Sequence, residues 1–277
     1  MVYYKINSHF KIVMILSILF AFSFDQLKSQ SIYKPTKEDY KALENVIVEK
    51  YYIATDDDVK DTVGGKLAKG SITYRVYIDL KPGYKLEMVY GYGDHPLNIE
   101  TSTYFFNDTI RGESTGENIN RANFNVHNVL LDSWVTMGGV SKFYNGVLLS
   151  EDPDTSVIKK RSQLSKVDGL LYQDVYGTIF YGNDLRFFQD SINPKKFYTE
   201  NGLWANYKYV EGPTESNKIL IAQLTTDGKL SFEINLQIAT PSGDPIKFVA
   251  RNTGNLIKES KNTEIVEIYS KYLTYNQ

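Results

Sequence analysis

The 277-residue chain contains no cysteine. This absence excludes disulfide bonds, CxxC metal or redox motifs, and a lipid anchor attached to a cysteine after signal cleavage. Histidine occurs three times and tryptophan twice. The chain also lacks an HExxH zinc motif, a phosphate-binding P-loop and a three-glycine dinucleotide fingerprint. An exported protein of this composition must be stabilised by core packing or by bound ions.

The N-terminus has the pattern of a secretory signal. Lys5 and Lys11 precede an apolar run over 12–24, and a polar segment over 25–30 follows it. A membrane-spanning helix needs about 20 apolar residues, so this shorter run favours a signal peptide over residues 1–29. An uncleaved membrane anchor is the alternative. We expect export to the periplasm, the cell surface or the cell exterior, with no transmembrane segment in the mature chain.

The remaining composition is that of a globular protein. Hydrophobic residues make up 42% and charged residues 23% of the chain, which excludes disorder and a membrane bundle. Without residues 1–29 the chain has 28 basic and 32 acidic side chains, a net charge of -4. Nucleic acid is not expected as a partner, because phosphate binding needs a basic excess.

Alternation of apolar and polar residues dominates the sequence after residue 45. Residues 71–80 alternate strictly, turn at Pro82 and Gly83, and continue with the same period over 84–90. Residues 218–225 and 229–238 repeat this arrangement around Asp227 and Gly228. Period two with Pro, Gly and Asp between the runs predicts two antiparallel hairpins. A short helical segment is expected near Thr36, which precedes Asp39 in a capping pattern.

Short predicted strands separated by turn residues favour an all-β fold. The other expected strands are 45–54, 97–106, 130–137, 147–149, 170–181, 204–210 and 246–249. This spacing predicts an antiparallel β-sandwich or jelly roll with one or two packed sandwich units. A polar, charged stretch over 150–166 suggests a division into a first unit over 30–165 and a second over 166–277.

Several stretches carry a resemblance to known proteins: 74–86, 89–97, 101–108, 131–138 and 219–238, the last followed by Thr240-Pro-Ser-Gly. They resemble a group of secreted surface proteins of Bacteroidetes-type bacteria, which are often associated with type IX secretion. The resemblance implies a surface or envelope location and a β-rich architecture. It implies no catalytic residues, because no activity is settled for the group. The segment after Arg251 is shorter than the sorting module many members carry, so a periplasmic location stays open.

An aromatic cluster is the candidate ligand site. The 22 tyrosines exceed what a core usually needs. The candidate ligand-binding residues are Tyr90, Tyr92, Asp94, His95, Asn98 and Tyr104. Exposed rings stack on sugars or anchor a protein partner, and Asp and Asn side chains hydrogen-bond to hydroxyl groups. Tyrosines that simply pack on strands are the alternative explanation.

An acidic loop is the candidate metal site. Asp56, Asp57, Asp58 and Asp61 lie beside Gly64 and Gly65. Clustered carboxylates and exposed carbonyls are ligands that calcium prefers, so a structural calcium ion is the one cofactor considered. The spacing is not that of an EF-hand, and a solvated acidic turn is the alternative.

Sequence patterns that indicate catalysis are weaker than those that indicate ligand or metal binding. The sequence Gly112-Glu-Ser-Thr-Gly116 matches a nucleophile elbow but lies in a polar stretch, which indicates a loop. Asp79, Glu87 and Glu233 lie on predicted strands and are candidates for a paired-carboxylate glycosidase. We therefore expect a non-catalytic surface or envelope module that binds a glycan or protein. The alternatives are a jelly-roll carbohydrate-active enzyme and a structural component of an extracellular matrix.

Overall fold

The computed structural model describes residues 33–123, 128–151, 170–173, 175, 177–182, 188, 194–252, 257–258 and 265–277. The expected signal peptide over 1–29 and nearly all of the polar stretch over 150–166 lie outside the described residues. Within them, no α-helix is present, and no helix is long and apolar enough to cross a membrane. The fold is all-β, as the sequence predicts.

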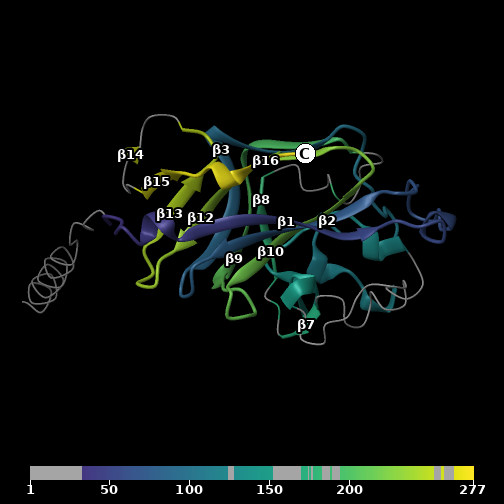
Figure 1. Ribbon diagram of the computed structural model, residues 1–277, viewed down its shortest axis with the longest axis horizontal. Helices are drawn as coiled ribbons and strands as arrows, with labels where there is room; N and C mark the ends of the chain where they lie inside the picture. Colours follow the sequence, from purple (N-terminus) through teal and green to yellow (C-terminus); the bar gives the residue numbers. More distant parts are fainter. Residues whose placement is uncertain are drawn as a thin grey trace, which may run out of the picture. The chain divides into compact units, whose positions relative to one another are not determined.

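The strands of the described residues form three sheets, and most of these strands are labelled in Figure 1. The four-stranded sheet has the order β1 (Leu43–Ile53), β2 (Ile72–Leu80), β10 (Lys218–Thr226) and β4 (Trp134–Val135). The nine-stranded sheet has the order β14 (Ile257–Lys258), β15 (Ile265–Tyr269), β13 (Pro245–Val249), β12 (Asn235–Ala239), β3 (Lys85–Thr101), β11 (Leu230–Glu233) and β16 (Thr274–Asn276). Its strand β9 (Lys196–Val210) pairs with the other edge of β3 and with β8 (Ile179–Tyr181). The small sheet contains β5 (Gly139–Ser141), β6 (Tyr144–Gly146) and β7 (Leu170–Tyr172).

Short 3-10 turns connect these strands. They are η1 (Asp39–Lys41), η2 (Asp58–Lys60), η3 (Gly116–Asn118), η4 (Arg121–Asn123), η5 (Asn128–Leu131), η6 (Leu149–Glu151) and η8 (Lys271–Leu273). The capping pattern at η1 is confirmed, because the Thr36 amide donates to Asp39 Oδ2 at 2.6 Å and the Asp39 amide donates to Thr36 Oγ1 at 3.3 Å. The residues over 147–149, expected as a strand, instead lead into η6.

Neither predicted hairpin forms, because the two strands expected to pair belong to different sheets. Strand β2 pairs with β1 and β10, whereas β3, which follows it after one tight turn, belongs to the nine-stranded sheet. The turn itself forms as expected: Gly83 has a φ of 85°, and the Tyr84 amide donates to the Lys81 carbonyl at 3.2 Å. The chain therefore turns sharply and passes from one sheet to the other.

The Asp227-Gly228 turn also carries the chain from one sheet to the other. Strand β10 pairs with β2 and β4, and β11 pairs with β3 and β16, so β10 and β11 do not form a hairpin. Gly228 does not have a positive φ. A Cβ atom there would lie 2.5 Å from Thr103 Oγ1 and 2.6 Å from Thr101 Oγ1. Glycine is thus needed for close approach to the segment after β3, and not for a hairpin turn.

Strands from both halves of the sequence share the same sheets. In Figure 1 the blue strand β2 lies beside green β10, and β3 lies beside yellow-green β12. The segments over 30–165 and 166–277 are therefore interleaved, and Lys34–Gln277 form one compact unit. Apolar side chains of the four-stranded and nine-stranded sheets fill the interior. The largest completely buried ones are Trp134, Trp204, Tyr74, Tyr77, Phe105, Phe188 and Phe248.

Candidate ligand-binding site

A groove of about 1070 Å³ lies over one face of the nine-stranded sheet. Four of its residues are register neighbours in successive strands: Met88 on β3, Gln237 on β12, Lys247 on β13 and Glu267 on β15. Side chains of register neighbours point to the same face of a sheet. The floor of the groove is therefore a continuous row that runs from an apolar to a charged end.

Two exposed tyrosines stand beside this floor. The exposed fraction is 71% for Tyr92 on β3 and 73% for Tyr181 on β8. Tyr90 also lines the groove but is only 4% exposed, so its ring is part of the floor. Residues two apart on a strand share a face, which explains why Met88, Tyr90 and Tyr92 all line the groove.

An irregular segment of β3 carries the candidate residues Asp94 and His95. Between Tyr92 and Leu97 the pairing of β3 with β9 shifts, and four residues of β3 oppose one residue of β9. Gly93 adopts a φ of 55°, which glycine tolerates and other residues rarely do. The wide bulge turns the backbone of this segment out of the regular ladder and toward the groove.

The side-chain amide of Asn235 holds the bulge in place. Asn235 is completely buried, and its Nδ2 donates to the carbonyl oxygens of Tyr90 at 3.1 Å, His95 at 2.9 Å and Pro96 at 3.3 Å. Its Oδ1 accepts from the Ala250 amide at 3.0 Å. The period-two alternation over 229–238 predicts a polar face for Asn235, but in the structure the side chain lies inside the sheet and bonds to carbonyls that the bulge leaves without ladder partners.

His95 and Glu267 form a buried pair in the wall of the groove. His95 Nε2 lies 3.0 Å from Glu267 Oε2, and the side chains are 3% and 10% exposed. His95 Nδ1 and the Tyr90 hydroxyl are also buried, and neither has a hydrogen-bond partner within the described part of the chain. Burial raises the pKa of Tyr90, and the charge of Glu267 raises it further, so the phenol stays protonated.

The rest of the floor is polar and held in place. Gln237 Nε2 donates to Glu87 Oε2 at 2.6 Å, and Lys247 Nζ lies 5.3 Å from the centre of the Tyr90 ring. Burial raises the pKa of Glu87 despite this hydrogen bond. Asn201 on β9 adds an amide to the lining. The groove therefore presents two exposed rings beside amide, ammonium and carboxylate groups, a combination suited to a polyhydroxylated ligand.

The structure brings four of the six predicted ligand residues together: Tyr90, Tyr92, Asp94 and His95 line the groove. Asn98 and Tyr104 do not line it. Other groove residues come from distant segments and are not predicted by the local sequence pattern, namely Tyr181, Asn201, Gln237, Lys247 and Glu267. Period-two alternation marked Gln237 as facing away from the apolar side of its strand, but nothing local indicated the strand register that joins these residues.

The four aspartates of the acidic loop have separate partners. Asp58 Oδ2 accepts from the Thr55 amide at 2.7 Å, Asp57 pairs with Lys60 at 2.7 Å, and Asp56 pairs with Lys69 at 2.8 Å. Asp61 lies 3.2 Å from an Arg111 nitrogen. Among the residues that the structure describes, no three His, Cys, Asp or Glu side chains gather as a metal site. The structure therefore does not gather these four carboxylates into one cluster.

The candidate catalytic residues are also separated. Asp79 lies on β2 of the four-stranded sheet, whereas Glu87 and Glu233 lie on β3 and β11 of the other sheet. Glu87 bonds to Gln237, and Glu233 pairs with Arg251. Ser114 lies in a loop before η3, with no α-helix following it, which confirms the loop interpretation of residues 112–116.

Comparisons with family models, with curated proteins and with solved structures found no match.

Proposed function

We propose that this protein is a non-catalytic binding module of the bacterial envelope or cell surface, and that its groove binds a glycan. The observation that carries the proposal is the pair of exposed tyrosines, Tyr92 and Tyr181, beside a floor of fixed polar groups. Exposed aromatic rings are costly in water, and a sugar face covers them while its hydroxyls bond to the polar floor.

The geometry supports binding better than hydrolysis. Glycosidases need two carboxyl groups about 5–9.5 Å apart across the scissile bond. The three candidate acids lie on separate strands of two sheets, and two of them have separate partners, Gln237 for Glu87 and Arg251 for Glu233. Glu267, a carboxylate of the groove, is occupied by His95 and is almost completely buried. These constraints favour recognition of a glycan without cleavage.

A glycan-binding screen on the mature chain tests the proposal. Wild type is compared with Tyr92→Ala and Tyr181→Ala, and with Tyr172→Ala as the matched control. Tyr172 is 71% exposed but lies on β7, outside the groove. Loss of one stacking ring is expected to weaken binding about tenfold, which corresponds to about 1.4 kcal/mol. Equal weakening by all three variants, or no glycan bound by wild type, would reject the proposal.

Export is the second part of the proposal and is tested separately. The apolar run over 12–24 behind Lys5 and Lys11 supports a cleaved signal. Intact-mass measurement of secreted material is expected to give a chain that begins at Gln30. A mass that still includes Met1 would contradict cleavage without bearing on the groove.

A further inference from the structure

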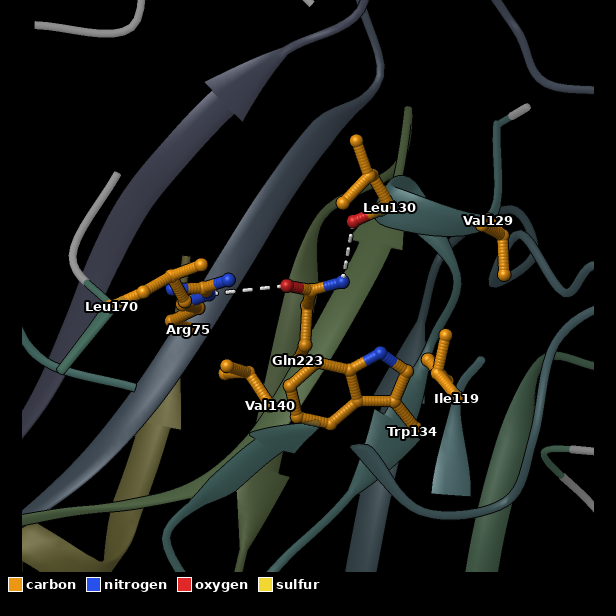
Figure 2. A pocket seen from close by; sticks show the side chains of 8 residues that line it. All are labelled: Arg75, Ile119, Val129, Leu130, Trp134, Val140, Leu170 and Gln223. Carbon is orange, nitrogen blue, oxygen red and sulfur yellow. Dashed lines mark hydrogen bonds between the residues drawn. The ribbon is translucent and has the colours of Figure 1, made fainter. Parts of the chain in front are cut away.

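A small cavity beside the four-stranded sheet is lined by a buried cation, Arg75, which no carboxylate of the described residues contacts. Its volume is about 10 Å³, roughly one water-sized sphere, and apolar side chains such as Ile119 and Val140 cover it. The polar groups of its lining come from Arg75, Gln223 and Trp134 (Figure 2). The cavity lies away from the groove, in a different sheet.

The polar residues form one row across the sheet. Glu49 on β1 is the register partner of Arg75 on β2, Arg75 that of Gln223 on β10, and Gln223 that of Trp134 on β4. Arg75 Nε donates to Gln223 Oε1 at 3.1 Å, and the guanidinium lies 3.5 Å from the centre of the Tyr51 ring. The row therefore fixes the guanidinium in place between two strands.

The Gln223 amide is fully occupied as a donor. Its Nε2 donates to the carbonyl oxygens of Leu130 at 2.9 Å and Asp132 at 2.8 Å. In Figure 2 the indole nitrogen of Trp134 is drawn on the ring edge nearer to this amide. The Gln223 Nε2 is a donor and cannot satisfy the donor groups of Arg75 and Trp134, and its acceptor Oε1 already accepts from Arg75 Nε.

Two buried donors of the lining have no hydrogen-bond partner within the described residues: Arg75 Nη1 and Trp134 Nε1. Arg75 is 4% exposed and Trp134 is 2% exposed. An arginine remains charged at any physiological pH, and a buried charge is costly unless it is paired. Both unpartnered groups are donors, and one carries a positive charge. The missing species must accept hydrogen bonds, and negative charge on it would lower the cost of burying Arg75.

Glu49 does not provide that charge by contact. No carboxylate oxygen of the described residues lies within 4.0 Å of the Arg75 guanidinium nitrogens. Burial raises the pKa of Glu49, which weakens it as a counter-ion, and its Oε1 accepts from the Leu149 amide at 2.8 Å. Glu49 therefore acts on the guanidinium through its charge at longer range, and within the described residues no anion contacts it.

We propose that this cavity binds a single halide ion, chloride under physiological conditions, between Arg75 Nη1 and Trp134 Nε1. A cavity of this size admits a monatomic ion and excludes sulfate, phosphate or a carboxylate ligand. The ion completes the polar row and neutralises Arg75 in the interior. Because β1, β2, β10 and β4 all contribute to the row, binding is linked to the folding of the whole four-stranded sheet.

Thermal unfolding in sodium chloride against sodium gluconate at equal ionic strength is the first test. At a hundredfold excess over Kd, chloride is expected to raise the Tm by about 5–10 °C. Trp134→Phe removes one ion donor and is expected to lose most of this response. Trp204→Phe is the matched control, because Trp204 is equally buried but does not line the cavity. An equal Tm in both salts for wild type would overturn the proposal.

Diffraction from wild-type crystals grown in sodium bromide gives a readout that needs no variant. We expect an anomalous peak within hydrogen-bond distance of Arg75 Nη1 and Trp134 Nε1. A cavity that holds only water, with no anomalous signal, would overturn the proposal even if Trp134→Phe failed to fold.

Discussion

His95 and Glu267 are 172 residues apart in the chain, yet their side chains meet at 3.0 Å in the wall of the groove. The contact joins the bulge of β3 to β15, two strands that are separated in the sheet by β12 and β13. The groove therefore takes its shape only when β15 is docked.

This contact leads to a stability prediction. Glu267→Leu leaves His95 Nε2 buried without a partner, so we expect a loss of about 1–3 kcal/mol in the free energy of unfolding. Glu267→Gln keeps an acceptor of the same size and should lose less. Urea unfolding measures both. A leucine variant as stable as wild type would show that the pair does not hold the wall together.

The amide of Asn235 leads to a second prediction. Asn235→Asp keeps the size of the side chain but faces a carboxylate toward three carbonyl oxygens. We expect destabilisation of about 3 kcal/mol together with weaker ligand binding, since buried donors are replaced by an acceptor. The exposed Asn45, whose side chain accepts from the adjacent Val46 amide, provides a control as Asn45→Asp. Chemical denaturation that shows equal stability of the two variants would contradict this role.

The Gly228 turn leads to a third prediction. Gly228→Ala places a Cβ atom within 2.7 Å of the Thr103 amide nitrogen and even closer to two threonine hydroxyls, so the turn must shift. We expect a loss of about 1–3 kcal/mol, the usual cost of overpacking. A Cβ atom at Gly177 would meet nothing within 4 Å, which makes Gly177→Ala the control. The turn assignment fails if both variants melt at the wild-type temperature.

Glu87 leads to a prediction on pH. Burial is the chief reason that its pKa in the folded state lies above the model-peptide value of 4.5. The folded state therefore binds this proton more tightly than the unfolded state does, and stability falls as the pH rises from 4.5 through the raised pKa. Glu87→Gln removes the titration, so its unfolding free energy should fall less over this range. Unfolding curves at several pH values decide this; parallel profiles for the two proteins would contradict it.

The sequence determines strands and turns well because both depend on local properties. Period-two alternation identified β2, the start of β3, and β10 through β12, and Gly83 adopts the turn conformation expected of it. Pairing is not a local property. An alternating strand buries its apolar face equally well beside its neighbour in the chain or across the core from it. The Asp227-Gly228 sequence therefore could not distinguish a hairpin from a crossing between sheets.

The same limit applies to the groove. Tyr90, Tyr92, Asp94 and His95 are close in sequence, so a local cluster was visible. Lys247 and Glu267 reach the groove only through the register of β13 and β15. The aspartates over 56–61 show the opposite case, since residues adjacent in the chain turn toward different lysine, arginine and backbone partners.

The two sheet-crossing turns also affect the order of events in folding. Strand β2 needs β10 as a partner, so the four-stranded sheet cannot be completed before residue 226 has been synthesised. The nine-stranded sheet includes β16 and cannot be completed before residue 276. Contacts this distant in the chain slow folding, because the entropy of closing long loops must be overcome first. We expect the emerging chain to remain largely unfolded until synthesis is nearly finished, the state in which a polypeptide can be threaded through a narrow translocation pore.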